Sequence, residues 1–160
     1  MAGTIYTYDP RGIQAKIAGA TLTDFTAQGT FVSLEPNSDL YTVEVGVQGN
    51  HTRSRSVDRS WTLKLSFPQE SPNNALLFNL SLIAKSSLAG SADIIPITIV
   101  DVNRSPAGQW FSPNGFLLRD PSVDYAATSG FYVWTFFLPT CVPTNIGVPV
   151  LPLIGALPAL

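Results

Sequence analysis

The chain has 160 residues, of which 45% are hydrophobic and only 12% are charged. A chain of this length folds as one domain that buries enough surface to need no disulfide or metal for stability. The net charge of −2 excludes a whole-chain attraction to nucleic acid or acidic membranes, and the single cysteine, Cys141, excludes an internal disulfide. Because charged residues are about half as frequent as usual, we expect much of the surface to be buried against partner subunits.

The two ends of the sequence bear on localisation. The N-terminus runs into polar and aromatic residues without a basic segment and an apolar run, so we expect no secretory signal and a protein that is made and kept inside the cell. The longest apolar stretch, residues 142–160, is interrupted by prolines, which argues against membrane insertion.

Most of the sequence has the pattern of short strands. Apolar segments of a few residues alternate with polar ones, and Gly, Pro and Asn clusters separate them, which predicts a mainly β, antiparallel domain. Strands are expected over residues 12–18, 22–34, 41–47, 61–67, 94–102 and 130–138.

The segments 41–47 and 61–67 alternate most regularly, and we expect them to pair as a hairpin. The residues between them contain no large apolar side chain except Val57, which predicts a long exposed loop over residues 49–60. The charged and titratable residues of this loop are His51, Arg53, Arg55, Asp58 and Arg59.

One helix is expected, over about residues 72–85. Ser71 can supply the N-cap oxygen, and Pro72 suits the first helical position because its missing N–H is not needed there. Leu76, Leu80 and Ile83 recur at helical spacing, and Phe78 and Leu82 widen the apolar coverage beyond one stripe. We therefore expect this helix to pack beside an edge or opening of the sheet.

The last third of the sequence predicts two further features. Ser112, Pro113 and Asn114 indicate a turn between two short strands. The strand at 130–138 has apolar residues on both faces, which requires protein on each side or an interface with a neighbour.

No set of residues points to catalysis. His51 is the only histidine and lies among arginines, and with one histidine and one cysteine the usual structural zinc site cannot be assembled. We therefore expect neither an enzyme nor a cofactor or metal. The arginines around His51 could contact phosphates, but there is no aromatic platform beside them and the chain is acidic, so pairing with acidic residues of a neighbouring subunit is favoured.

The order of these elements resembles the tail tube proteins of contractile-tailed bacteriophages, which are similar in fold to the tube protein of type VI secretion. The resemblance covers residues 5 to about 141: strands, a long polar hairpin loop at 49–60, a strand from Trp61, and a helix opened by Ser71 and Pro72. It is strongest from Arg59 to Ala84.

The resemblance implies a β-barrel or sandwich with one flanking helix, assembled as six-membered rings that stack into a hollow inner tail tube for DNA ejection. The family's long hairpin loop reaches the next ring, and residues 49–60 would be that loop. It further implies a virion protein assembled in the host cytoplasm, with tail sheath, tape measure and baseplate proteins as partners and with genomic DNA passing through the lumen without specific binding. Alternatives are another β-sandwich virion subunit, such as a capsid decoration or baseplate protein, or a carbohydrate-binding β domain with Trp110 or Trp134 on an exposed platform.

The chain departs from a compact tube subunit at its C-terminus. We divide it into a tail-tube-like β domain, 1–141, and a Pro- and Leu-rich extension, 142–160, which could span up to ~60 Å if extended. The extension is expected to contact neighbouring subunits through its larger apolar residues, Val148, Val150, Leu151, Leu153, Ile154 and Leu157.

Overall fold

A computed structural model gives the structure of the chain, and it describes Gly3, Ile5 and residues 7–26, 29–86, 92–103 and 107–144. In this part of the chain the fold is mainly β and antiparallel with one α-helix, as the sequence predicts, and the main sheet has eight strands. In chain order the elements are η1 (Pro10–Gly12), β1 (Ile13–Ile17), β2 (Ala20–Leu22), β3 (Val32–Pro36), β4 (Tyr41–Val45), β5 (His51–Arg55), β6 (Trp61–Pro68), α1 (Asn73–Ser86), β7 (Ile95–Asp101), β8 (Gly108–Arg119), β9 (Phe131–Leu138) and β10 (Val142–Thr144).

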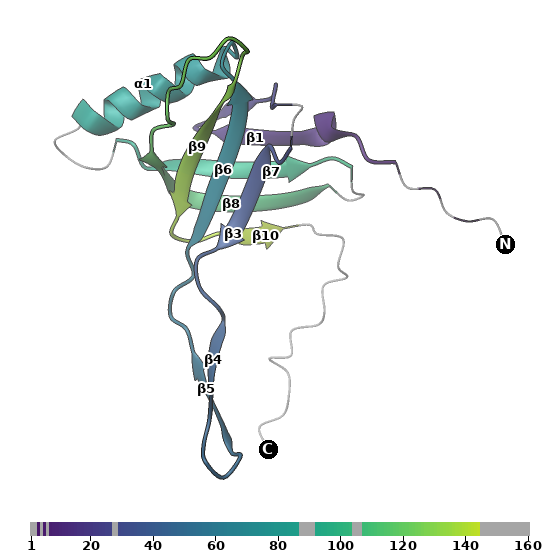
Figure 1. Ribbon diagram of the computed structural model, residues 1–160, viewed down its shortest axis with the longest axis vertical. Coiled ribbons are helices and arrows are strands. Elements are labelled where there is room, and N and C mark those ends of the chain that lie inside the picture. The colour runs from purple at the N-terminus through teal and green to yellow at the C-terminus, as the bar shows by residue number, and fades with distance from the viewer. Residues whose placement is uncertain are drawn as a thin grey trace.

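The main sheet has the strand order β2-β1-β7-β8-β9-β6-β3, and β10 pairs with β8. It folds into two layers whose strands cross steeply (Figure 1). The long strand β8 belongs to both layers: its first half pairs with β7 and β10, and its second half pairs with β9. The result is a sandwich, the second of the two architectures that the sequence left open.

A bulge and a glycine bend β8 between the two layers. Pro113 and Asn114 lie between the paired positions Ser112 and Gly115, where the register with β7 shifts. A Cβ on Gly115 would lie 2.5 Å from Ile97 Cδ1, so only glycine fits at this close approach. The turn predicted at Ser112, Pro113 and Asn114 is therefore wrong: a bulge takes up the proline inside one continuous strand.

The core lies between the two layers. The inward residues of β6 and β9 alternate with outward ones, as predicted, and Trp134 and Phe136 are completely buried. Phe131 and Val133, on the other face of β9, remain exposed. The buried cluster consists of Ala15, Ile17, Leu22, Leu63, Leu65, Phe67, Leu77, Leu80, Ile95, Ile97, Ile99, Tyr132, Trp134, Phe136 and Leu138.

One side of the sandwich is open. Within the described residues, the end strands β2 and β3 do not pair with each other, so the sheet does not close into a barrel. The segment 22–34, predicted as one strand region, is strand only at its two ends, and the chain between β2 and β3 bridges the gap. Phe25 holds this bridge in place by stacking on Phe67 with ring centroids 5.0 Å apart.

Helix α1 begins two residues after Ser71 and ends at Ser86, which confirms the predicted helix to within a residue. The Ser71 hydroxyl accepts a hydrogen bond from the Asn73 N–H at 3.4 Å. The helix lies at the end of the sandwich opposite β4 and β5 (Figure 1). Of the three apolar residues at helical spacing, Leu80 is buried, whereas Leu76 and Ile83 are exposed. The buried residues of the helix are Asn74, Leu77, Leu80 and Ser81.

Candidate assembly interface

The strands β4 and β5 form a separate hairpin that projects from the sandwich (Figure 1). The sequence predicted that residues 41–47 pair with 61–67, and this is wrong. The register of β4 runs from Tyr41 opposite Arg55 to Val45 opposite His51, while β6 pairs with β3 and β9. The expected loop at 49–60 is therefore half strand, and only its ends are turn and connection.

Hydrogen bonds fix the stem where the hairpin leaves the sandwich. The Ser56 N–H donates to the Leu40 carbonyl at 2.9 Å, and the hydroxyls of Ser38 and Ser56 lie 3.1 Å apart. Closer to the body, the Asn37 N–H donates to the Ser60 carbonyl at 3.0 Å. These contacts continue the β3–β6 pairing outward. The chain from β3 to β6 is therefore one long hairpin that is irregular at the stem.

A tight turn closes the tip of the hairpin. The Gly46 N–H donates to the Asn50 carbonyl at 2.7 Å, and the Gly49 N–H donates to the Gly46 carbonyl at 2.8 Å. Gly49 has φ +80°, which favours glycine at this position. Val47, between the two glycines, is fully exposed at the tip.

The hairpin has two different faces, because residues directly opposite in an antiparallel pair share a face. One face carries only small polar residues and Glu44. The other, called here the valine–arginine face, has apolar side chains on β4 and cationic or titratable ones on β5. It consists of Tyr41, Val43, Val45, His51, Arg53 and Arg55.

The valine–arginine face is uncovered in the single chain. Val43 and Val45 are 60% and 64% exposed. The Arg53 guanidinium lies 4.5 Å from the centroid of the Tyr41 ring, a cation–π contact that holds the arginine along the strand. An isolated two-stranded hairpin is only marginally stable in water. The exposed valines beside the arginines therefore favour a partner surface that covers this face of the hairpin.

The structure separates the five predicted contact residues into two groups. His51, Arg53 and Arg55 lie on the projecting strand β5, whereas Asp58 and Arg59 lie in the stem. Asp58 serves the local turn, because its carboxylate accepts the Ser60 N–H at 2.9 Å. Hydrogen bonding to the side chain and then the backbone of Ser60 lowers the pKa of Asp58.

Sequence reasoning missed the apolar half of this face. The alternation of Tyr41, Val43 and Val45 with polar residues predicts a half-buried strand, but all five residues of β4 are exposed. A signal was present in the partner segment, because Thr52 and Ser54 alternate with His51, Arg53 and Arg55 as in a strand with one large-residue face. The predicted contact residues of the C-terminal tail lie outside the described residues.

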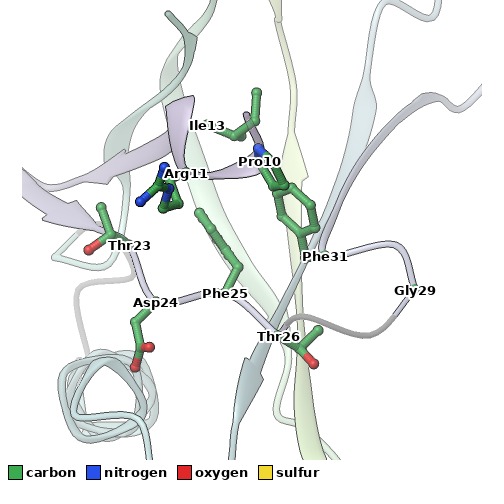
Figure 2. A pocket seen from close by; sticks show the side chains of 9 residues that line it. All are labelled: Pro10, Arg11, Ile13, Thr23, Asp24, Phe25, Thr26, Gly29 and Phe31. Atoms are coloured by element: carbon green, nitrogen blue, oxygen red, sulfur yellow. The ribbon is translucent and has the colours of Figure 1, made fainter. Parts of the chain in front are cut away.

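Two further apolar surfaces are exposed. On α1, Leu76, Leu82 and Ile83 face outward. On the open side of the sandwich, a cavity of about 760 Å³ lies between residues 10–13 and the 23–31 segment. Figure 2 shows the rings of Phe25 and Phe31 projecting into this cavity from one wall.

The described residues offer little support for other kinds of site. Among them, no three His, Cys, Asp or Glu residues are grouped so that they could hold a metal ion. Trp134 is fully buried and Trp110 packs on Trp61 with ring centroids 5.4 Å apart, so neither forms the open platform that a carbohydrate-binding domain would need. In the described part of the chain, no helix is long and apolar enough to cross a membrane.

No protein-family model matches the sequence, and no curated protein matches it significantly. Three solved structures with a similar fold come from contractile injection systems. A chain of the anti-feeding prophage cap, described as a tube-terminating cap, is 13% identical with a TM-score of 0.58, and the match covers 90% of this chain and 95% of that one.

Two chains from an extracellular contractile injection system named PVC have the same fold. One, from its sheath/tube terminator in the extended state, is 14% identical with a TM-score of 0.60 over 89% of this chain and 99% of that one. The other, from its sheath–tube complex in the extended state, is 15% identical with a TM-score of 0.55 over 87% and 92%. The chain is thus similar in fold, over nearly its whole length, to components of contractile tube assemblies.

Proposed function

We propose that this chain is a non-enzymatic structural subunit that forms rings, and that the rings stack into the inner tube of a contractile tail or injection particle. The observation that carries the proposal is the projecting β4–β5 hairpin, whose valine–arginine face is uncovered in the single chain. The similarity in fold to components of contractile tube assemblies supports it, as does the low share of charged residues.

The hairpin acts in this proposal as the contact between successive rings. A head-to-tail contact uses two different surfaces of the same subunit, and it either closes into a ring or repeats along an axis. The hairpin projects at one end of the sandwich and α1 lies at the other, so one copy can reach the next along this direction (Figure 1). Arg53 and Arg55 fix the orientation by pairing with carboxylates, and the valines provide the apolar contact.

The finer features of the proposal follow the tail-tube resemblance. The rings are hexameric, the subunit assembles in the host cytoplasm into a virion or virion-like particle, and a sheath, a tape measure protein and a baseplate are the partners. The lumen serves as a conduit through which DNA passes without specific binding.

A charge reversal on the valine–arginine face tests the proposal. We expect Arg53→Glu with Arg55→Glu to leave the sandwich folded and the rings intact but to abolish stacking, as seen by negative-stain imaging and sedimentation velocity. The matched control is Thr52→Glu with Ser54→Glu, which places carboxylates on the opposite face of the same strand. Stacks of normal length from the Arg53/Arg55 variant would refute the role of this face, and a wild-type chain that forms neither rings nor stacks would refute the whole proposal.

A second candidate is a terminator that caps the tube. It is favoured by two of the similar structures, which are described as a tube-terminating cap and a sheath/tube terminator. A tube subunit stacks without limit, whereas a terminator forms single rings and binds only the end of a tube. Concentration-dependent growth of the wild-type protein into long stacks therefore supports the tube subunit, and discrete rings at every concentration support the terminator.

A further inference from the structure

An apolar groove runs along the open side of the sandwich. It is formed by two adjoining cavities, of about 760 Å³ and 330 Å³, which share Ile13 and Phe31 in their linings. The second cavity continues the first along β3 to Leu34 and across to Trp110. Figure 2 shows the wider part, where Phe25 and Phe31 face the segment that begins at Pro10. Arg11 and Asp24 also line this part, so the groove is apolar but not without polar groups.

Among the described residues, β3 pairs with β6 on one side only, and its other edge lies beside this groove. The Ser66 N–H donates to the Phe31 carbonyl at 2.9 Å, and Val32 is opposite Leu65, so the amides of Val32 and Leu34 point away from β6. Both residues line the groove. An open strand edge next to an apolar groove is the arrangement that binds an extended segment through main-chain hydrogen bonds and side-chain pockets.

The chain contains a segment with the matching composition. Residues 145–160 carry no charged side chain, and prolines at 149, 152 and 158 disfavour a continuous helix. An apolar, proline-interrupted segment is suited to an extended conformation. Its valines, leucines and isoleucines gain free energy from burial, which the groove can provide.

The end of β10 lies at the correct end of the sandwich for this segment to reach the groove. Thr144 is opposite Gln109, next to Gly108, which in turn pairs with Asp101. Asp101 pairs with Ile13 in the groove wall. Three strand spacings, roughly 14 Å, separate β10 from β1, whereas sixteen extended residues reach about 53 Å. A tethered segment at this range has an effective concentration near the millimolar level for its own groove.

We infer that the C-terminal segment 145–160 docks in the groove of its own chain, along the free edge of β3 and over Phe25 and Phe31. The position of Thr144 favours the same chain over a neighbouring subunit as the owner of the groove. The docked segment closes the open side of the sandwich. It also covers the edge of β3, which would otherwise be free to pair with other chains. This inference does not depend on the proposed tube, because it concerns the single chain.

Amide hydrogen exchange of the full-length chain tests the inference. In the variant Leu151→Asp with Leu153→Asp, which would place carboxylates in the groove, we expect the Val32 and Leu34 amides to exchange at least tenfold faster than in the wild-type protein. The Ser33 amide, which points toward β6, is the internal control and should be unchanged. The matched variant Asn145→Asp with Ala159→Asp adds the same charge at the ends of the segment and should exchange like the wild type.

Two results would overturn the inference. The first is equal exchange of the Val32 and Leu34 amides in the wild-type protein and the Leu151/Leu153 variant, which would show that the segment does not cover β3. The second is loss of protection of the Val32 and Leu34 amides when the wild-type chain is diluted below the concentration at which it assembles. That loss would show that a neighbouring subunit supplies the segment. Retained protection in the dilute wild-type chain, with loss in the variant, supports docking within one chain.

Discussion

The indole N–H of Trp134, in the middle of β9, donates a hydrogen bond to Asn74 Oδ1 at 3.0 Å, in the first turn of α1. Both side chains are buried, and the Asn74 amide also donates to the Pro68 carbonyl at 2.7 Å. One asparagine therefore joins the start of the helix, the end of β6 and the largest fully buried side chain. Phe78 completes the contact, because its ring packs edge-on against Trp134 at 4.7 Å.

Removing this asparagine should destabilise the fold more than its small size suggests. In Asn74→Ala, the buried Trp134 N–H loses its partner, which costs about 1–3 kcal/mol. The Pro68 carbonyl keeps its hydrogen bond from the Ser71 N–H at 3.0 Å. We expect the free energy of unfolding in urea to fall by at least ~1 kcal/mol. Asn79→Ala on the exposed side of the same helix is the control, because it gains the same helix propensity but should stay within about 0.5 kcal/mol of the wild type. Equal effects of the two substitutions would contradict the role of Asn74.

Gly115 should not tolerate a side chain. In Gly115→Ala, the new Cβ would lie 2.5 Å from Ile97 Cδ1 and 2.8 Å from Leu138 Cδ2. Overpacking of this kind costs about 1–3 kcal/mol, which urea unfolding measures. Adding Ile97→Val removes one of the two clashing atoms, so the double variant should be more stable than the sum of the single changes predicts. Gly46→Ala in the hairpin turn is the control, since the only neighbour within 4 Å lies 3.6 Å from the added Cβ.

The sequence predicted the elements whose periodicity reflects burial on one side. The alternation in β6 and β9, and the serine and proline before α1, led to the correct elements within about a residue. The pairing of strands could not be obtained in the same way. Because β4 is exposed on both faces, its alternation of valines with polar residues indicates a strand but does not indicate whether a core or a partner covers it.

The buried face of the helix and the bulge in β8 could not be predicted from the sequence for a different reason. Asn74 and Ser81 face inward because each has a partner far along the chain, Trp134 and Asp120, and helical periodicity favours leucines at such positions. Pro113 indicates a turn by local preference, yet a bulge opposite β7 absorbs it. The candidate site shows the same limit: the sequence provided the cationic half of the hairpin, but only the register brought Tyr41, Val43 and Val45 onto the same face.

Asp120 should make the attachment of α1 dependent on pH. Its carboxylate accepts hydrogen bonds from Lys85 and from the Ser81 hydroxyl, and these bonds lower the pKa of Asp120. A carboxyl whose pKa is lower in the folded state stabilises the fold fully above its unfolded pKa of about 4, and that contribution disappears as the pH falls through the folded value.

The consequence is measurable by urea unfolding of Asp120→Asn. At pH 7 and low salt we expect this variant to be less stable than the wild type by no more than about 1 kcal/mol, because the pair is partly exposed and screened by solvent. The difference should shrink below pH 4 and also at neutral pH in 1 M salt. A difference that stays constant from pH 7 to pH 2 would show that the charge of Asp120 does not stabilise the helix.

Cys141 should report on the stem of the projecting hairpin. It lines a cavity of about 430 Å³ together with Leu40, Asp58 and Trp61, and burial raises the pKa of the Cys141 thiol to about 11. At pH 8 only about one thiol in a thousand is then ionised, compared with roughly a quarter for an ordinary cysteine, and the thiolate is the reactive form. We therefore expect iodoacetamide to alkylate the folded chain over a hundredfold more slowly than the urea-unfolded chain, with a rate that rises tenfold per pH unit from pH 8 to pH 10.

Ser38→Ala removes a hydroxyl that joins the two strands of the stem, so it should accelerate alkylation of Cys141 without lowering the free energy of global unfolding appreciably. If folded and unfolded chains reacted at the same rate, the stem would be open in solution and the hairpin would not be held at a fixed angle to the sandwich.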